Sequence, residues 1–356
     1  MNKTNYLDWV SLFLMGTVMI LVSCNVEKDR ILDKNFPIEK ELNSKRLSID
    51  ETLNPGDFRI VGDFFVFQNE YISGEDCFYV FDRDMKFCYS FGRLGNGPQE
   101  FIGPRIVHGK QKENQFYIFD PAYGKLFEYN LRKDNPVFVS ELKVEIGPFP
   151  SQHTSIINDS ILVYVEMNNE HYGLFSYNYN QHETIDSLIF QTPFKELLGN
   201  KYNSSYDGFG CSTNGNKFVL TFNYIDEIKI GEIDSIGRFV IDKTFEEGTF
   251  NSSYSPKKSD NLTYYIFPEM SDRHIYAPYY GLQSLYLMPF PFNPYGRSFK
   301  FLIEVYDLNK SPIARLSLDS DLLRIVVDEK NGKLYTWNIL KDFDYLLEYD
   351  ISFLID

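Results

Sequence analysis

Cysteine is scarce in this sequence, with four in 356 residues, which excludes the dense disulfide framework of small secreted domains. Cys77 and Cys88 lie on two short β-like runs joined by a polar turn. An antiparallel hairpin centred near Asp84 would pair Cys88 with Val80 and place Cys77 opposite Phe91. The two cysteines would then lie roughly 10 Å apart along the strands, beyond the ~7 Å Cα separation that a disulfide allows. We therefore expect both to be buried as small hydrophobic side chains.

Basic residues are outnumbered by acidic ones. The chain has 35 Lys and Arg against 50 Asp and Glu, which gives a formal net charge of −15. An acidic surface repels the phosphate backbone of nucleic acids, so we expect no nucleic-acid partner. No long run of like charges indicates a disordered acidic tail.

Helical patterns are also rare. Residues 194–199 fit a short helix that ends at a glycine, and elsewhere short β-like runs are broken by Gly, Asn, Asp and Pro. Aromatic residues make up 17% of the chain, and their rings suit the half-buried surface of a sheet. These features predict an all-β protein.

The β-like runs recur as comparable units spaced roughly 40 to 60 residues apart, which is the period of propeller blades. Each unit alone would expose one face of its sheet, so neighbouring units must pack against one another. The pattern predicts a six-bladed β-propeller with four-stranded antiparallel blades, and a β-sandwich, or two of them, is the alternative. The six units contain residues 58–92, 115–130, 158–178, 216–231, 273–307 and 332–350.

The last predicted strand, near residues 345–351, needs a partner if the ring is to close. Residues 41–49 form a β-like run that can supply it. A strand from the N-terminal end of the propeller would then complete the last blade and remove an open sheet edge.

The first residues form an apolar stretch from Trp9 to Val22, followed by Ser23 and Cys24. A run of this length suits a signal peptide and is short for a membrane span. The sequence Leu-Val-Ser-Cys at residues 21–24 resembles the lipobox of bacterial lipoproteins, in which the cysteine thiol accepts a diacylglycerol. The alternative is a membrane-anchor helix with an incidental cysteine.

The lipobox resemblance implies a signal peptide at residues 1–23 and a tether lipidated at Cys24 over residues 24–38. The repeated units then place the propeller over residues 39–356. We therefore expect a protein of the cell envelope that is anchored in the outer membrane by its lipid. Both the periplasmic side and the cell surface are consistent with the sequence.

The segment Phe-Gly-Arg-Leu-Gly-Asn-Gly-Pro-Gln-Glu-Phe at residues 91–101 is the most specific motif. It resembles a signature in six-bladed propeller lipoproteins of Bacteroidota, which are called TolB-like or NHL-like. Residues 303–335 are similar to the last blade of that family. The family carries no defined activity or catalytic residues, so the resemblance implies a fold and a location only.

The glycines of this segment do not form a phosphate-binding loop. No Lys-Ser or Lys-Thr pair follows Gly97, and no helical pattern begins after it. We therefore expect a tight connection between two blades.

The sequence shows no catalytic or metal-binding pattern. No Gly-x-Ser-x-Gly elbow is present, and the histidines have no metal-type spacing. We therefore expect no catalytic residues, no metal and no cofactor, although histidines of a propeller can still converge from distant segments. The five histidines are His108, His153, His171, His182 and His274.

A proline-rich, aromatic stretch over residues 279–296 is the best candidate for ligand contact. Proline excludes it from a central strand. If its rings are exposed, they form a platform for a sugar face or a protein partner; otherwise the stretch packs over the blades. The candidate residues are Tyr279, Tyr280, Tyr286, Phe290, Phe292 and Tyr295.

These observations favour a membrane-anchored, non-enzymatic propeller that binds a protein or a glycan through loops on a rigid ring. The alternative is a carbohydrate-active hydrolase or lyase with its site at the mouth of the propeller channel. A convergent Asp/Glu/His cluster at that mouth would favour the enzyme, and aliphatic or scattered polar groups would favour the binding module.

Overall fold

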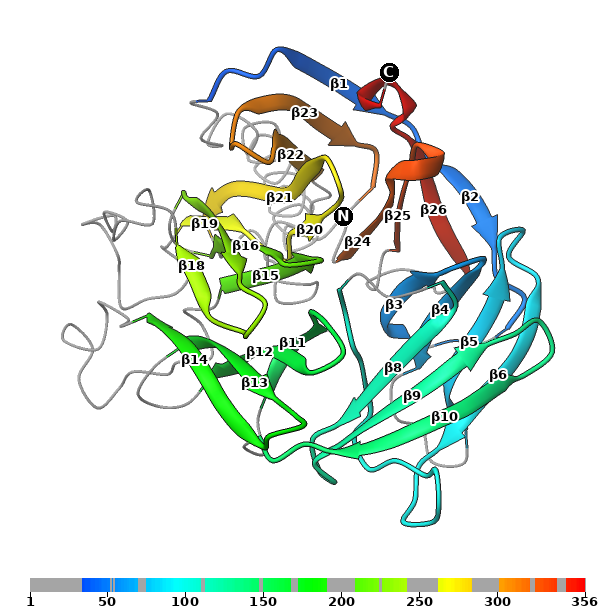
Figure 1. Ribbon diagram of the computed structural model, residues 1–356. Coiled ribbons are helices and arrows are strands. Elements are labelled where there is room, and N and C mark those ends of the chain that lie inside the picture. The colour runs from blue at the N-terminus through cyan, green and yellow to red at the C-terminus, as the bar shows by residue number, and fades with distance from the viewer. Residues whose placement is uncertain are drawn as a thin grey trace, which may run out of the picture.

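Six β-sheets are arranged in a ring around a central axis in the computed structural model (Figure 1). The fold is the predicted six-bladed β-propeller. Five sheets are four-stranded and antiparallel as predicted, and the sheet of blade 5 has six strands in the described residues. The structure describes residues 34–51, 53, 55–69, 75–109, 113–146, 150–167, 172–190, 209–223, 226–241, 262–283, 301–320, 324–337 and 344–355. Within these residues no helix is long and apolar enough to cross a membrane. The short helix expected at residues 194–199 lies outside them.

The first three blades follow one another along the chain. Blade 1 contains β3 (Pro55–Val61), β4 (Phe64–Asn69), β5 (Asp76–Asp82) and β6 (Phe87–Arg93). Blade 2 contains β7 (Arg105–Ile106), β8 (Gln115–Asp120), β9 (Lys125–Leu131) and β10 (Pro136–Lys143). Blade 3 contains β11 (Pro150–Ile156), β12 (Ile161–Met167), β13 (Tyr172–Asn178) and β14 (Glu183–Phe190).

The other three blades complete the ring. Blade 4 contains β15 (Phe209–Asn214), β16 (Lys217–Phe222), β17 (Ile228–Ile233) and β18 (Phe239–Ile241). Blade 5 contains β19 (Leu262–Tyr265), β20 (Glu269–Met270), β21 (His274–Gln283), β22 (Phe301–Asp307), β23 (Pro312–Leu318) and β1 (Ile38–Leu42). Blade 6 contains β24 (Arg324–Asp328), β25 (Lys333–Trp337), β26 (Tyr345–Asp350) and β2 (Lys45–Ser48). Two short 3-10 turns, η6 (Glu329–Asn331) and η7 (Ser352–Leu354), follow β24 and β26.

The hydrophobic core lies between the blades. Each of six buried clusters joins two neighbouring sheets, including the pair formed by blades 6 and 1. Phe78 of blade 1, for example, packs edge-on against Phe116 of blade 2, with ring centroids 5.6 Å apart. Because each sheet buries its faces only against its neighbours, the blades stabilise one another around the ring.

The N-terminal segment closes the ring as the sequence predicts. β2 pairs antiparallel with β26, so that Lys45 lies opposite Glu348 and Ser48 opposite Tyr345. The run expected over residues 41–49 is nevertheless divided between two blades. Its first residues belong to β1, which adds to the outer edge of blade 5 in parallel with β23. Ser44 marks the break, where its backbone N–H and hydroxyl both donate to Asp319 Oδ2, at 3.0 and 3.1 Å.

The cysteines in the described part of the chain are free, so the prediction that Cys77 and Cys88 form no bridge is confirmed. The predicted register is wrong by one residue, because Phe78 and not Cys77 lies opposite Phe91. The register shifts after Val80, and Cys88 has no residue paired opposite it. A β-bulge of this kind adds one residue to a strand and cannot be read from the turn position. Cys77 is buried, whereas Cys88 is only half-buried.

The glycine-rich segment is a blade-to-blade connection, as expected. Its Gly95 N–H donates to the Phe101 carbonyl at 2.9 Å, and its Gly97 N–H donates to Glu100 Oε2 at 2.6 Å. Phe101 is fully buried in the cluster between blades 1 and 2. The segment thus uses these amides internally and anchors the connection with one ring.

Replacing Gly92 with alanine should lower the free energy of unfolding by about 2 kcal/mol, because the backbone is strained there for any other residue. Gly92 has a φ of +80°, and an added Cβ would lie 2.9 Å from the buried ring of Phe101. Urea denaturation of the two proteins measures the difference. Gly215→Ala is the matched control, because it also has a positive φ (59°) but has open space around an added Cβ. Equal losses in both variants would contradict the role given to the Phe101 contact.

Candidate functional site on the propeller axis

Polar side chains from five blades meet near the axis of the ring. They lie on or next to the innermost strands of their blades (Figure 1). The innermost strands of neighbouring blades contact one another there, as β24 does with β3 and β15 with β20. The residues of this axial cluster are Asp57 and Arg59 on β3, His108 after β7, His153 on β11, Glu269 on β20 and Arg324 on β24. They come from positions far apart in the sequence.

Ion pairs and hydrogen bonds join five of these residues in one chain. Arg59 Nη1 donates to both carboxylate oxygens of Glu269, at 2.9 Å each, and Arg59 Nη2 contacts His108 Nδ1. His108 Nε2 lies 3.1 Å from Asp57 Oδ2, and Arg324 Nη1 lies 2.6 Å from Asp57 Oδ1. A guanidinium can only donate, so Nδ1 of His108 accepts and Nε2 donates its hydrogen to Asp57. This series of contacts links blades 1, 2, 5 and 6 across the axis.

His153 completes the cluster from blade 3. Its ring centroid lies 5.0 Å from that of His108, and its Nε2 is 2.8 Å from the hydroxyl oxygen of the buried Ser155. Burial, together with the positive charges of Arg59 and Arg324, lowers the pKa of His153 to about 3. His153 is therefore neutral at physiological pH.

The accessible part of the cluster consists of four charged side chains. Their exposed fractions are 17% for Arg59, 16% for Glu269, 14% for Arg324 and 11% for Asp57, whereas His108 retains 4%. Burial raises the pKa of Glu269, and the adjacent Arg59 opposes this shift. A ligand that approaches along the axis would therefore meet two guanidinium groups and two carboxylates.

Both carboxylates of the cluster are already occupied. Asp57 Oδ1 contacts Arg324 and accepts the N–H of Phe58 at 2.8 Å, while its Oδ2 contacts His108. Both oxygens of Glu269 accept from Arg59. The described residues contain no group of three or more His, Cys, Asp and Glu side chains placed to hold a metal ion. The arrangement offers hydrogen-bonding groups to a polar ligand, and its acids are neutralised by arginines.

Acidic pH should destabilise the folded protein through His153. An unfolded histidine binds a proton near pH 6.5 and the folded one only near pH 3, so stability is lost as the pH falls below 6.5. Between pH 7 and pH 5 this single group contributes a loss of about 2 kcal/mol. Urea unfolding at both pH values should show a pH-dependent loss that is smaller by this amount in His153→Gln. A matched control is His182→Gln on an exposed turn, which should leave the pH dependence unchanged.

The comparisons with known proteins agree with the fold. No protein-family model matches the chain, and a search of curated proteins finds no similar sequence. Solved structures share its architecture. A Bacteroides fragilis protein described as exported has 15% identity and a TM-score of 0.53, and the match covers 88% of this chain and 98% of that one. A member of the DUF4221 family from Bacteroides vulgatus has 12% identity and a TM-score of 0.54, with 89% and 97% covered. At these identities the likeness shows the fold alone.

The aromatic residues proposed as ligand contacts fall into two groups. Tyr279 and Tyr280 lie on β21, where they retain 1% and 7% of their exposure and belong to core clusters on opposite faces of blade 5. These two rings pack in the core, which is one of the two arrangements that the sequence allows. The other candidates lie outside the described residues, as does the lipidation candidate: Tyr286, Phe290, Phe292, Tyr295 and Cys24.

Two of the histidines do converge, as a propeller allows. His108 and His153 meet at the axis, whereas His274 pairs with Glu329 at 2.6 Å in another part of the ring. The sequence analysis did not identify the charged members of the axial cluster. A signal was present in β3, where Asp57 and Arg59 alternate with Phe58 and Ile60. Charged residues at alternate positions of an apolar strand must find partners in the folded protein.

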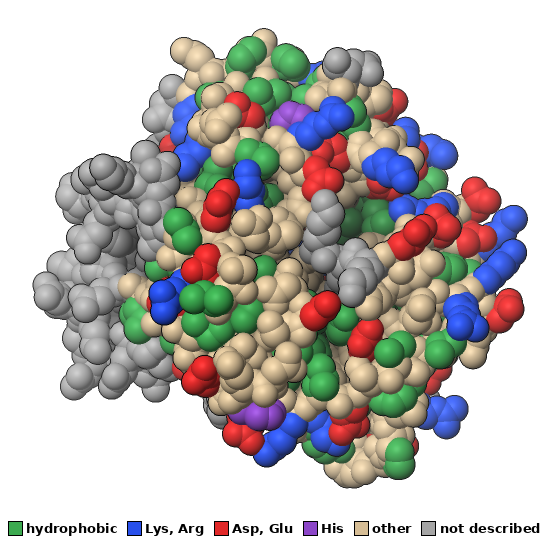
Figure 2. Space-filling view, viewed as in Figure 1, with side chains coloured by type: hydrophobic (Ala, Val, Ile, Leu, Met, Phe, Trp, Pro, Cys, Tyr) green, Lys and Arg blue, Asp and Glu red, His purple; other side chains and the backbone are tan. Residues whose placement is uncertain are grey.

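The face seen in Figure 1 carries acidic and basic side chains intermixed with hydrophobic ones, without a broad area of one charge (Figure 2). The axial cluster, with its convergence from five blades, is therefore the best candidate site in the part of the chain that the structure describes.

Proposed function

We propose that this chain is an exported, lipid-anchored propeller of the TolB-like or NHL-like type from Bacteroidota, and that it binds a glycan or protein at the axial cluster. The lipobox-like residues 21–24 and the segment at residues 91–101 support the anchor and the family. The fold shared with the two Bacteroides proteins is compatible with both.

The observation that carries the binding role is the mutual neutralisation of the axial charges. Arg59 holds both oxygens of Glu269, and Arg324 and His108 hold those of Asp57. A general base or nucleophile needs a carboxylate oxygen free to reach the substrate. Paired guanidinium and carboxylate groups instead suit the recognition of hydroxyl and carboxylate groups, which glycans and peptides supply.

Glycan-array screening of the mature chain, followed by calorimetry of the strongest ligand, tests this role. Arg324→Lys keeps the charge but removes the planar fork, and we expect it to weaken binding about tenfold, equivalent to ~1.4 kcal/mol. Lys45→Ala is the control, because this exposed lysine lies on β2 at the outer edge of blade 6. Unchanged affinity in Arg324→Lys would exclude the axial cluster as the binding site.

Metabolic labelling with an alkyne fatty acid tests the lipid anchor. The wild-type chain should carry the label and fractionate with membranes, whereas Cys24→Ser should lose both properties because the thiol is the acceptor. Membrane association of Cys24→Ser would instead support the alternative anchor helix. Protease treatment of intact cells then distinguishes the surface from the periplasmic side.

A second candidate function is that of a hydrolase or lyase acting on carbohydrate. It is favoured by two observations. Asp57, Glu269 and two histidines converge at the axis, which is the kind of cluster expected of the enzyme. Burial also raises the pKa of Glu269, as a general acid requires. Assays with a panel of polysaccharides and lactones test it. Turnover that is abolished in Glu269→Gln would establish the enzyme, and the lack of any turnover would support the binding module.

A further inference from the structure

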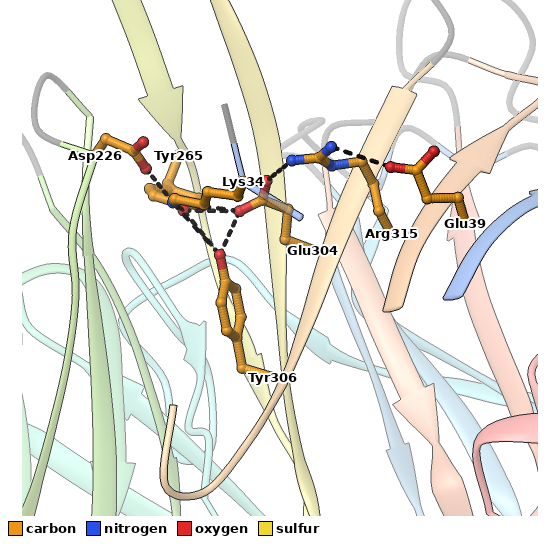
Figure 3. Close-up of polar contacts among 7 residues, drawn as sticks. All are labelled: Lys34, Glu39, Asp226, Tyr265, Glu304, Tyr306 and Arg315. Carbon is orange, nitrogen blue, oxygen red and sulfur yellow. Dashed lines mark hydrogen bonds and ion pairs between the residues drawn. The ribbon is translucent and has the colours of Figure 1, made fainter. Parts of the chain in front are cut away.

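The segment that precedes β1 is fixed to the propeller by the contacts of a half-buried lysine, Lys34 (Figure 3). Lys34 Nζ lies 2.5 Å from the Tyr265 hydroxyl and 3.5 Å from Glu304 Oε2, and it also contacts Asp226. Tyr265 and Glu304 belong to blade 5, and Asp226 lies between β16 and β17 of blade 4. The lysine therefore sits at the junction of two blades.

Glu304 is the central acceptor of this site, and its partners surround it (Figure 3). Its side chain is fully buried, and its Oε2 accepts from the hydroxyls of Tyr265 and Tyr306, at 2.9 and 2.5 Å. Its Oε1 accepts from Arg315 Nη2 at 2.9 Å. These partners all lie in blade 5, so the receiving site for Lys34 is built from the propeller itself.

The residues after Lys34 add further contacts. Phe36 is buried, with its ring centroid 5.5 Å from that of Tyr306 and the Arg315 guanidinium 4.6 Å from its ring. β1 then pairs with β23, and Lys40 Nζ lies 3.6 Å from the centroid of the Phe353 ring. An ammonium site, a buried ring and a paired strand together hold residues 34–42, part of which the sequence analysis had assigned to the tether.

We propose that this segment orients the propeller on the membrane, with the rim at blades 4 and 5 toward the lipid and blades 1 and 2 away from it. The proposal rests on lipidation at Cys24. Ten residue steps separate Cys24 from Lys34, and they span at most about 35 Å. Blades 1 and 2 lie across the ring from blades 4 and 5 (Figure 1). A chain fixed only from β2 onward would have a tether longer by eleven residues and would leave its orientation open.

Energy transfer to a lipid-bound acceptor in vesicles tests the orientation with the lipidated full chain. Val240 on β18 of blade 4 and Val139 on β10 of blade 2 are a matched pair, because they are 52% and 51% exposed. Each is replaced by cysteine and labelled with a donor in a Cys88→Ala background, since Cys77 and Cys211 are buried. We expect more efficient transfer from the donor at Val240→Cys than from that at Val139→Cys.

Lys34→Ala combined with Phe36→Ala should reduce this difference, because the tether then lengthens. The exposed Lys143→Ala on blade 2 should leave it unchanged. Equal transfer from both labels in a chain that co-floats with the vesicles would overturn the orientation while the lipid anchor stands. A chain that does not co-float would contradict the anchor, and the orientation with it.

Discussion

Replacing Glu304 with alanine should lower the free energy of unfolding by about 3 to 5 kcal/mol, the cost of leaving a buried charge without its partner. Arg315 retains 7% of its side-chain exposure, and of its two acidic partners in the described residues it would keep Glu39, an exposed residue at 3.4 Å. The buried hydroxyls of Tyr265 and Tyr306 would lose their shared acceptor. Several unsatisfied groups would thus remain at the junction of blades 4 and 5.

Urea denaturation followed by tryptophan fluorescence measures this loss of stability. Two further variants are compared with Glu304→Ala. Glu39→Ala removes the exposed partner of the same arginine and should cost less than about 1 kcal/mol. Glu304→Gln keeps the shape and an acceptor oxygen, so its loss should lie between those of the two alanine variants. A loss in Glu304→Ala no larger than in Glu39→Ala would show that the buried network does not stabilise the fold.

Replacing Arg59 with alanine should have a loss of similar size, about 3 to 5 kcal/mol, for the same reason at the axis. Glu269 would lose the donor to both of its oxygens, and His108 would lose the group that contacts its Nδ1. Because the chain of contacts continues through Asp57 to Arg324, the change weakens the links among four blades.

Two comparisons distinguish the effect of breaking the buried Arg59–Glu269 pair from the general effect of removing an arginine. Arg93→Ala removes a side chain that is 79% exposed and should cost less than about 1 kcal/mol. The double variant Arg59→Met/Glu269→Met should recover much of the loss, because no buried charge is left unpaired. If the double variant is less stable than Arg59→Ala alone, the unpaired carboxylate is not the cause of the loss.

The blades could be predicted from the sequence because each is a local run of strands and turns. The run at residues 58–67 is now the β3–β4 hairpin, with a turn at Gly62, whose φ is +55°. Aromatic residues in these strands fill the spaces between neighbouring sheets, as Phe78 and Phe116 do. Local pattern and period were sufficient for the fold because the hydrophobic core of each blade packs only against the neighbouring blades.

The N-terminal strands could be predicted only in part. The last strand needs a partner, and the sequence indicated one near residues 41–49. In the structure β2 is that partner. The parallel addition of β1 to blade 5 left no such signal, because an extra strand on an outer edge satisfies no requirement visible in the sequence. The sequence does contain one sign of the site that receives Lys34. Glu304 is a carboxylate inside the apolar run of β22, and a buried carboxylate requires polar partners.

The axial cluster could not be predicted because its members are brought together only by ring closure. Asp57 and Arg324 are in direct contact although they belong to the first and last blades. Glu269 and His108 occupy different positions in their own blades, so no common spacing marks them. Contacts of this kind depend on the three-dimensional arrangement of all six sheets.

Disulfide trapping across β2 and β26 tests the closed ring most directly. Lys45 and Glu348 lie opposite each other, and paired antiparallel residues have Cα atoms about 4.5 to 5.5 Å apart, within reach of a disulfide. Lys45→Cys/Glu348→Cys should therefore oxidise to an intramolecular bridge, seen by peptide mass spectrometry. Arg46→Cys/Glu348→Cys should form none, because neighbouring residues of a strand point to opposite faces. Failure of the first pair to cross-link in the folded protein, or equal cross-linking of both pairs, would contradict closure of the propeller by its N-terminal strand.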